Sequence, residues 1–115
     1  MIFKRSEAFH TEKAGVEMWI YNGKDDLEAA AVAYQKTALG HEDEFRHTKS
    51  AFVFYVISGS GEWVIEGESF PVEATDVVIV PAGKRFYYRG ELEQVCLTAP
   101  AWEEEFEETI RTVEL

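Results

Sequence analysis

The stretch that decides the fold is Phe52-Val53-Phe54-Tyr55-Val56-Ile57-Ser58-Gly59-Ser60-Gly61-Glu62-Trp63-Val64. Its first six residues are all apolar, and most are β-branched or aromatic, which is typical of a β-strand. Because every position is apolar instead of every second one, we expect both faces of this strand to be buried. The Ser-Gly-Ser-Gly segment predicts a turn, and hence a β-hairpin whose second strand runs from Glu62 to Glu66.

The composition is that of one globular domain. The chain has 115 residues, 46% of them apolar and 29% charged, which suits a single domain with one core. The single cysteine, Cys96, excludes an internal disulfide and fits a reducing compartment. The N-terminal residues lack the apolar run of a signal peptide, and no stretch is long enough to cross a membrane. We expect a soluble, cytoplasmic protein without membrane partners.

The chain is strongly acidic. It carries 22 acidic and 11 basic residues, a formal charge of −11. Such a surface repels phosphate backbones, which argues against DNA or RNA as a partner. Several of the basic residues nevertheless fall in two short windows: Arg46 and Lys49, and Lys84, Arg85 and Arg89.

Strand-like runs separated by turn residues recur along the chain. Runs of this size at such spacing are typical of an all-β sandwich or barrel. Besides the central segment, the expected strands are Val16 to Tyr21, Ser69 to Glu73, Val77 to Val80, Phe86 to Arg89 and Gln94 to Thr98, with a turn at Gly90-Glu91. Met1 to Arg5 is a candidate short edge strand, of the kind that two molecules can exchange.

Two segments carry helical signals. Asp25 to Leu39 has a capping pattern and an alanine-rich body, although as a strand it would place residues 29, 31, 33, 35 and 37 on one face. In the C-terminal segment, Trp102, Phe106, Ile110 and Val113 recur at near-helical spacing behind Pro100. We predict a short amphipathic helix over about 101–111.

The glycine and proline positions match a known pattern. Gly59 after Tyr55-Val56, Asp76, and the Pro81-Ala82-Gly83 turn resemble the two motifs of the small single-domain cupins. The resemblance covers roughly residues 40–100 and implies one antiparallel jelly-roll β-barrel over residues 1–115. It also favours the strand interpretation of residues 25–39.

The metal ligands of that family have no counterparts here. The positions of its three histidines and its glutamate hold Phe45, His47, Phe52 and Phe86. Phenylalanine has no lone pair to donate, so we predict no metal or other cofactor. The alternative is an off-register metal site at His41 and His47.

The same register turns a set of mostly aromatic side chains toward the barrel interior. They either fill the barrel as core or line an apolar cavity for a small ligand oriented by His47, Tyr88 and Tyr34. The side chains expected inside are Phe45, His47, Phe52, Phe54, Val56, Phe86 and Tyr88.

Polar residues suggest what such a cavity would bind. Arg46 and Arg85, with their basic neighbours, would form a cationic rim for an anionic ligand, unless they pair with nearby acids. His47, neutral in an apolar barrel, is a candidate general base with Tyr88 or Tyr34 as its acid.

We therefore expect a metal-free cupin-like barrel that binds a small organic ligand, such as a sugar or an organic acid. The doubly apolar strands further predict a homodimer. The resemblance leaves two alternatives: a metal-independent sugar isomerase or epimerase using His47 with a tyrosine, and a filled barrel acting as an accessory subunit.

Overall fold

Nine antiparallel strands and two 3₁₀ turns make up the computed structural model, which describes residues 1–115. The expected all-β, cupin-like barrel is confirmed. No helix is long and apolar enough to cross a membrane. The elements are η1 (Arg5–Glu7), β1 (Phe9–Lys13), β2 (Val16–Ile20), β3 (Ala31–Thr37), β4 (Asp43–His47), β5 (Ala51–Ile65), β6 (Glu68–Glu73), β7 (Val77–Val80), β8 (Phe86–Ala99), η2 (Glu104–Phe106) and β9 (Glu107–Thr112).

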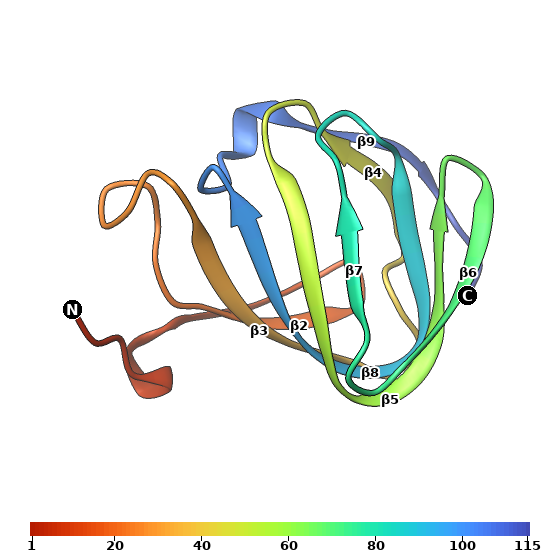
Figure 1. Ribbon diagram of the computed structural model, residues 1–115, viewed down its shortest axis with the longest axis horizontal. Helices are drawn as coiled ribbons and strands as arrows, with labels where there is room; N and C mark the ends of the chain where they lie inside the picture. The colour runs from red at the N-terminus through yellow and green to blue at the C-terminus, as the bar shows by residue number, and fades with distance from the viewer.

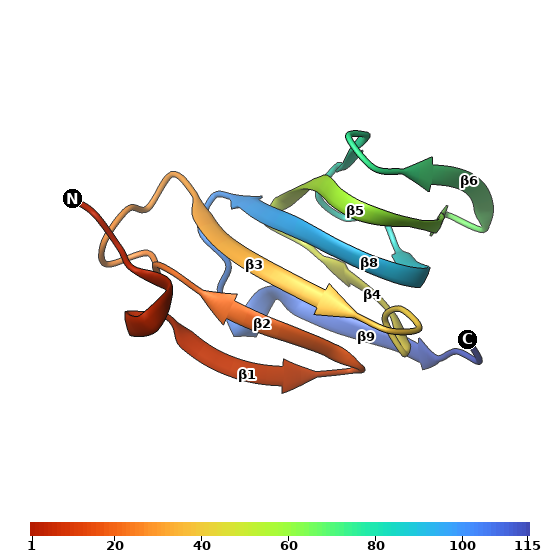
Figure 2. The same cartoon turned by 90° about the horizontal axis from the view of Figure 1, so that it is seen from below.

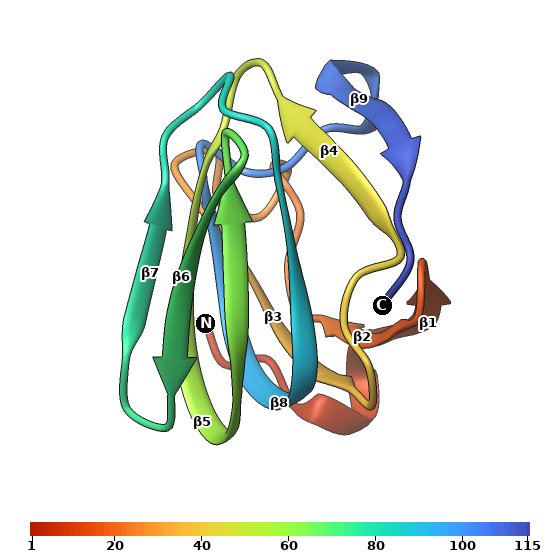
Figure 3. The ribbon, with the colours of Figure 1, turned by 90° about the vertical axis from the view of Figure 1, so that its right-hand side faces the viewer.

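The strands form one sheet that folds over onto itself, as Figure 1 shows. The first half contains β1, β2, β3, the second part of β8, the first part of β5, and β7. The second half contains β6, the second part of β5, the first part of β8, β4, and β9. The first half is seen in Figure 2, and β4 with β9 of the second half in Figure 3.

The two halves are joined by β5 and β8, which bend together and run through both. The predicted hairpin at Ser58–Gly61 is therefore wrong, and so is the predicted turn at Gly90-Glu91. Glycine is used at the bend because the two backbones touch there: a Cβ built on Gly61 would lie 2.0 Å from the Arg89 carbonyl oxygen. The glycines mark a close approach of two strands instead of a reversal of one.

The interior is filled by alternate side chains of both halves. Trp63 and Tyr88 stack on each other with ring centroids 4.6 Å apart. Apolar burial of this kind is the main contribution to folding stability. The buried core comprises Val16, Phe45, Phe52, Phe54, Val56, Trp63, Val72, Val80, Phe86, Tyr88, Leu92 and Cys96.

Residues 25–39 follow the strand interpretation. Ala31–Thr37 forms β3, which pairs with β2 on one side and β8 on the other. Two ladders satisfy the backbone of this strand, and that long-range pairing overrides the local helical signal. Asn22 closes the preceding loop by accepting a hydrogen bond from the Val32 amide and donating one to the Ala30 carbonyl.

The predicted C-terminal helix over 101–111 is wrong. The segment makes only the turn η2 and then the strand β9, which pairs with β4 from Asp43↔Thr112 to His47↔Glu107. The free edge of β4 supplies the backbone partners that a local helix would otherwise have supplied. Trp102 and Phe106 pack near His47 with ring centroids 6.3 and 6.1 Å away.

The N-terminal edge strand was expected in the wrong place. Residues 1–4 belong to no strand, and the first strand is β1 at Phe9–Lys13. β1 is exposed at four of its five positions, so its sequence carries little apolar alternation.

The close approach at the bend predicts a large effect of one methyl group. Gly61→Ala should lower the free energy of unfolding by about 2–4 kcal/mol, because the backbones of β5 and β8 must separate. Gly23→Ala is the matched control, since nothing lies within 4 Å of a Cβ at Gly23. Urea unfolding of both variants measures the effect, and equal stabilities would contradict the role of the bend.

Candidate functional site

The expected aromatic interior is present and closely packed. Phe45 lies 4.5 Å from Phe86 between ring centroids, and Phe54 lies 5.9 Å from both Phe52 and Phe86. These rings contact one another instead of surrounding open space. In this part of the barrel the aromatic side chains act as core.

His47 is an interior residue with a structural role. Its Nε2 donates to the Glu103 carbonyl at 2.9 Å, and its Nδ1 accepts from the Ser50 amide at 2.8 Å. Both ring nitrogens are thus occupied by backbone groups, and the side chain is only 2% exposed. The structure therefore does not present His47 as a general base with a tyrosine partner. It joins the loop after β4 to the segment after β8.

His41 is the buried histidine that has one ring nitrogen without a hydrogen bond. It is 5% exposed and stacks on Phe45 at 4.3 Å, with Tyr88 at 5.7 Å between ring centroids. Its Nδ1 lies 2.7 Å from the Asp43 carbonyl oxygen and 3.2 Å from the Asp43 amide nitrogen. Because a carbonyl oxygen can only accept, the shorter contact assigns the proton to Nδ1, and Nε2 makes no hydrogen bond. Burial lowers the pKa of His41 below its ordinary value near 6.5. His41 is therefore a neutral imidazole with an unused lone pair, which is the state a general base requires.

Tyr88 lies beside His41 in a small buried polar group. Its hydroxyl donates to Gln35 Oε1 at 3.4 Å, and Gln94 Nε2 donates to the same oxygen at 2.9 Å. Burial raises the pKa of Tyr88 far above its ordinary value, so the phenol keeps its proton. Two buried polar atoms of this region, Trp63 Nε1 and Gln94 Oε1, have no hydrogen-bond partner in the chain. Buried polar atoms are normally paired, so these two are exceptions within the barrel interior.

Tyr34 does not belong to this group. Its hydroxyl donates to Glu93, and its ring lies against Trp19 at 5.3 Å on the outer face of β3. Burial and this hydrogen bond raise the pKa of Tyr34 to about 12. The barrel wall separates it from His47, so the predicted pairing of those two is not found.

Most of the basic residues near the two motifs are paired with acids. Arg46 pairs with Glu108, and Arg89 with Glu62. Arg85 donates to Glu44, a carboxylate that is 1% exposed and also accepts from Arg111 at 2.9 Å. Lys84 has no acidic partner. The expected anion-binding rim is therefore largely neutralised by its own neighbours.

The donor set for a metal is missing. No three His, Cys, Asp or Glu side chains lie close enough together to hold a metal ion. Phe45, Phe52 and Phe86, which the resemblance places at the family's ligand positions, are all buried in the aromatic cluster. The residues do not fit a cupin metal.

Two hollows open outside the aromatic cluster. One hollow has a volume of about 320 Å³. It is lined by Gly40 and Glu42, which precede and follow His41 in the chain, and by Gly15 and Val113. The other, of about 530 Å³, is acidic and lies on the outer side of the sheet. Its charged lining residues are Glu12, Glu17, Lys36, Glu91 and Glu93.

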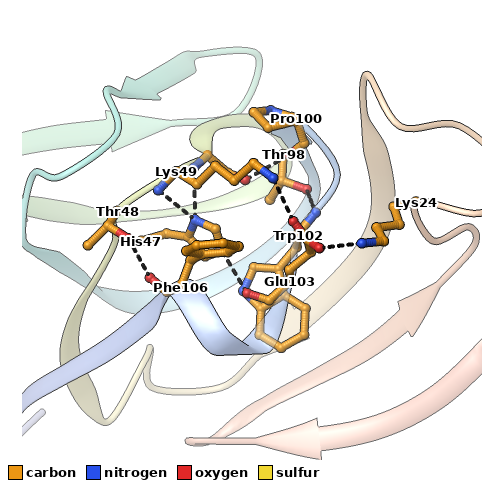
Figure 4. A network of polar contacts seen from close by, with 10 residues as sticks. Lys24, His47, Thr48, Lys49, Thr98, Pro100, Trp102, Glu103 and Phe106 are labelled. Atoms are coloured by element: carbon orange, nitrogen blue, oxygen red, sulfur yellow. Dashed lines mark hydrogen bonds and ion pairs between the residues drawn. The ribbon is translucent and has the colours of Figure 1, made fainter.

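Glu103, Lys24 and Lys49 form a charged cluster, here termed the latch, at one end of the barrel, and Figure 4 shows its contacts. The Glu103 carboxylate accepts from Lys24 at 2.7 Å and from Lys49 at 2.8 Å, which ties the loop before β3 and the loop before β5 to the segment after β8. These bonds lower the pKa of Glu103 to about 2. The Ala101 amide also donates to the Glu28 carbonyl at 2.9 Å.

The latch predicts a pH-dependent opening of this end. Because the pKa of Glu103 is lowered on folding, its contribution is complete above pH ~4.5 and is lost as the pH falls toward ~2. Glu103→Gln should lower the hydrogen-exchange protection of the Ala101 amide about two- to fivefold near neutral pH, and much less near pH 2. Glu104→Gln is the control, because Glu104 is exposed and unpaired. Equal protection in both variants would show that the latch does not hold the loop.

The sequence carries a signal that His41 faces the interior. His41, Phe45 and His47 are separated by even numbers of residues, so simple alternation places all three on one side of the chain. Which nitrogen is free, however, depends on backbone groups of distant segments and cannot be read from spacing.

Comparisons with known proteins agree with this fold. The family model described as "Cupin domain" matches residues 32–97. A tyrosine-to-phenylalanine variant of PAC13 from Streptomyces, solved with uridine, is 32% identical over 99% of this chain and 93% of that chain, with a TM-score of 0.94. The structure of Pac13, described as a unique nucleoside dehydratase, is 31% identical with the same coverage and a TM-score of 0.93.

More distant structures share the fold. KdgF from Halomonas sp. is 16% identical over 91% of this chain and 97% of that chain, with a TM-score of 0.75. PAC13 was also solved with uridine as a histidine-to-glutamine variant and as a variant at a second tyrosine. The comparison with curated proteins finds no match.

Proposed function

The chain belongs to the cupin domain family, and on that premise we propose that it binds an uncharged nucleoside-like molecule and removes water from it by metal-independent acid–base catalysis. The observation that carries the proposal is the free Nε2 of the buried, neutral His41 beside Tyr88. The spacing of residues in the PAC13 structures supports it. The histidine and one of the tyrosines replaced there are as far apart in sequence as His41 and Tyr88.

The chemistry follows from the protonation states. Nε2 of His41 takes a proton from a carbon next to the one that bears the leaving hydroxyl, and the C–H electron pair forms a carbon–carbon double bond. The carbon–oxygen bond breaks, and the imidazolium returns its proton to the departing hydroxide, which leaves as water. Tyr88, which stays protonated, donates a hydrogen bond to the leaving oxygen.

The charges around the site favour a neutral ligand. Most basic side chains near the motifs already have acidic partners, so little positive charge is left to hold a carboxylate or phosphate. A nucleobase, by contrast, offers both acceptors and donors to the unpaired Trp63 Nε1 and Gln94 Oε1. Its flat face also suits a neighbourhood of aromatic rings.

Of the three positions replaced in the PAC13 variants, one holds a different residue type in this chain. By the same spacing, the other tyrosine replaced in those structures falls on Phe54, which is 1% exposed and has no hydroxyl. The proposed reaction therefore relies on one tyrosine, Tyr88. The absence of a metal-donor cluster around His41 supports chemistry without a metal.

The proposal includes a cytoplasmic homodimer. The central strand is apolar on both faces, and only its inner face is covered within the chain. The single buried Cys96 suits a reducing compartment. The formal charge of −11 argues against a nucleic-acid partner.

Replacing His41 tests the proposal. The expected result is that His41→Gln still binds uridine, detected by amide shifts in labelled protein, but loses water elimination by about 10²–10⁴-fold. Elimination is measured by mass spectrometry on nucleosides with an electron-withdrawing group beside the C–H bond. His10→Gln, a change on exposed β1, should leave both unchanged.

Two outcomes would contradict the proposal. The first is a wild-type protein whose residues around His41 show no shifts with uridine. The second is water elimination that survives His41→Gln at the wild-type rate.

A further inference from the structure

The segment that carries His41 is a short loop between two strands. Residues 38–42 join β3 to β4, and Leu39 at their centre is 68% exposed. The hollows of about 530 and 320 Å³ are both lined by Gly15 and Ala38, so open space borders the first part of this loop in two places. Side-chain packing therefore contributes little to the position of this part, and hydrogen bonds must supply most of it.

Thr37, the last residue of β3, holds the loop by its hydroxyl. The residue is 7% exposed, and its Oγ1 accepts a hydrogen bond from the Gly40 amide at 2.9 Å. The hydroxyl proton has two acceptors, the Gly15 carbonyl oxygen at 2.9 Å and the Gly40 carbonyl oxygen at 3.1 Å. No other side chain outside residues 38–42 hydrogen-bonds to the loop backbone. One hydroxyl thus joins the turn between β1 and β2 to the residue immediately before His41.

Gly40 transmits this constraint to His41 and Tyr88. It has a φ of +122°, and a Cβ built on it would overlap with the Tyr88 carbonyl oxygen. The same oxygen accepts a hydrogen bond from the His41 amide at 2.9 Å. The loop backbone is therefore in contact with the backbone of Tyr88. A shift of Gly40 changes the position of the imidazole relative to the Tyr88 ring, whose centroid lies 5.7 Å away.

We propose that Thr37 is a positioning residue for the acid–base pair of His41 and Tyr88. The inference rests on the proposed function, because it assigns Thr37 a part in the same reaction. Thr37 acts through Gly40 and not by contact with the substrate. Its hydroxyl fixes the loop so that Nδ1 of His41 stays bonded to the Asp43 carbonyl and Nε2 stays free. Such placement matters, because a displacement of about 1 Å can lower a rate about 100-fold.

Removal of the hydroxyl has a defined consequence. In Thr37→Val the side chain keeps its shape, but the amide of Gly40, a buried residue, loses its acceptor. A buried N–H group without a partner is unfavourable, so we expect the loop to move until this amide reaches water in one of the two hollows. Thr37→Ser retains the hydroxyl and should keep the loop in place.

Thr98→Val is the matched control. Thr98 is 6% exposed, and its hydroxyl likewise accepts a hydrogen bond from a backbone amide, that of Trp102 at 3.1 Å. Figure 4 shows it beside the latch, and it makes no hydrogen bond to residues 38–42. The control therefore removes a comparable buried hydroxyl without changing the bonds that hold the His41 loop.

The first measurement is the steady-state rate of water elimination from the nucleosides used to test His41. Thr37→Val should lower kcat about 10–100-fold while KM changes less than about twofold, because the groups that contact the nucleoside remain. Thr37→Ser and Thr98→Val should keep a kcat close to that of the wild type. If either of them loses as much as Thr37→Val, the role assigned to the Thr37 hydroxyl is overturned.

The second measurement requires no reaction. The nitrogen NMR resonances of the His41 ring report which nitrogen carries the proton, and in the wild type this should be Nδ1. In Thr37→Val both tautomers should be populated, and protection of the His41 amide against hydrogen exchange should fall about tenfold or more. Unchanged resonances and unchanged protection overturn the proposal. If this variant does not fold, Thr37→Ala gives the same comparison, because it also lacks the hydroxyl.

Failure of the positioning role is distinguished from failure of the proposed function. A wild-type protein that neither binds uridine nor eliminates water contradicts the proposed function, and the ring resonances then still decide whether Thr37 holds His41. An active wild type whose kcat survives in Thr37→Val leaves the proposed function standing and contradicts the positioning role.

Discussion

The structure depends on the place where β5 and β8 bend against each other. Glycines at 59, 61 and 90 let the two backbones come into contact, and a Cβ at any of them would lie 2.0–2.4 Å from a carbonyl oxygen of the other strand. Because both strands pass through the bend, the two halves of the sheet face each other over one interior. The same strands carry Trp63 and Tyr88 on one side of the bend and Gln94 on the other. The bend of β5 and β8 therefore positions both the core and the buried polar group.

Much of the fold could be predicted from alternation of apolar residues. The strand interpretation of residues 25–39 placed residues 29, 31, 33, 35 and 37 on one face. Within β3, Ala31, Gln35 and Thr37 of that face are buried. The errors arose where a local signal has two physical meanings. Ser-Gly-Ser-Gly is as suitable for a bend in a continuous strand as for a hairpin turn, and only the glycine of the facing strand distinguishes them. The helical spacing from Trp102 to Val113 was overridden by the open edge of β4, which no local pattern reveals.

At the candidate site, too, the sequence predicts some features, while contacts with distant segments determine the others. Family spacing led to His47, and burial of that residue was predicted correctly. The hydrogen bonds that occupy both its nitrogens come from Ser50 and Glu103, the second far away in sequence. His41 differs because its Nε2 has no such partner. Arg85, expected at a ligand rim, is instead held by the buried carboxylate of Glu44, a pairing set by the folding of β4 against β8.

The most direct test of this account is a crystal structure of the wild-type protein grown with uridine. The account predicts the nucleoside within the barrel, with one of its atoms at hydrogen-bonding distance from Nε2 of His41 and its base near Trp63 or Gln94. A nucleoside bound only in the acidic hollow around Glu12 and Glu91, or a barrel that stays closed to it, would contradict the assignment of His41 as the catalytic base.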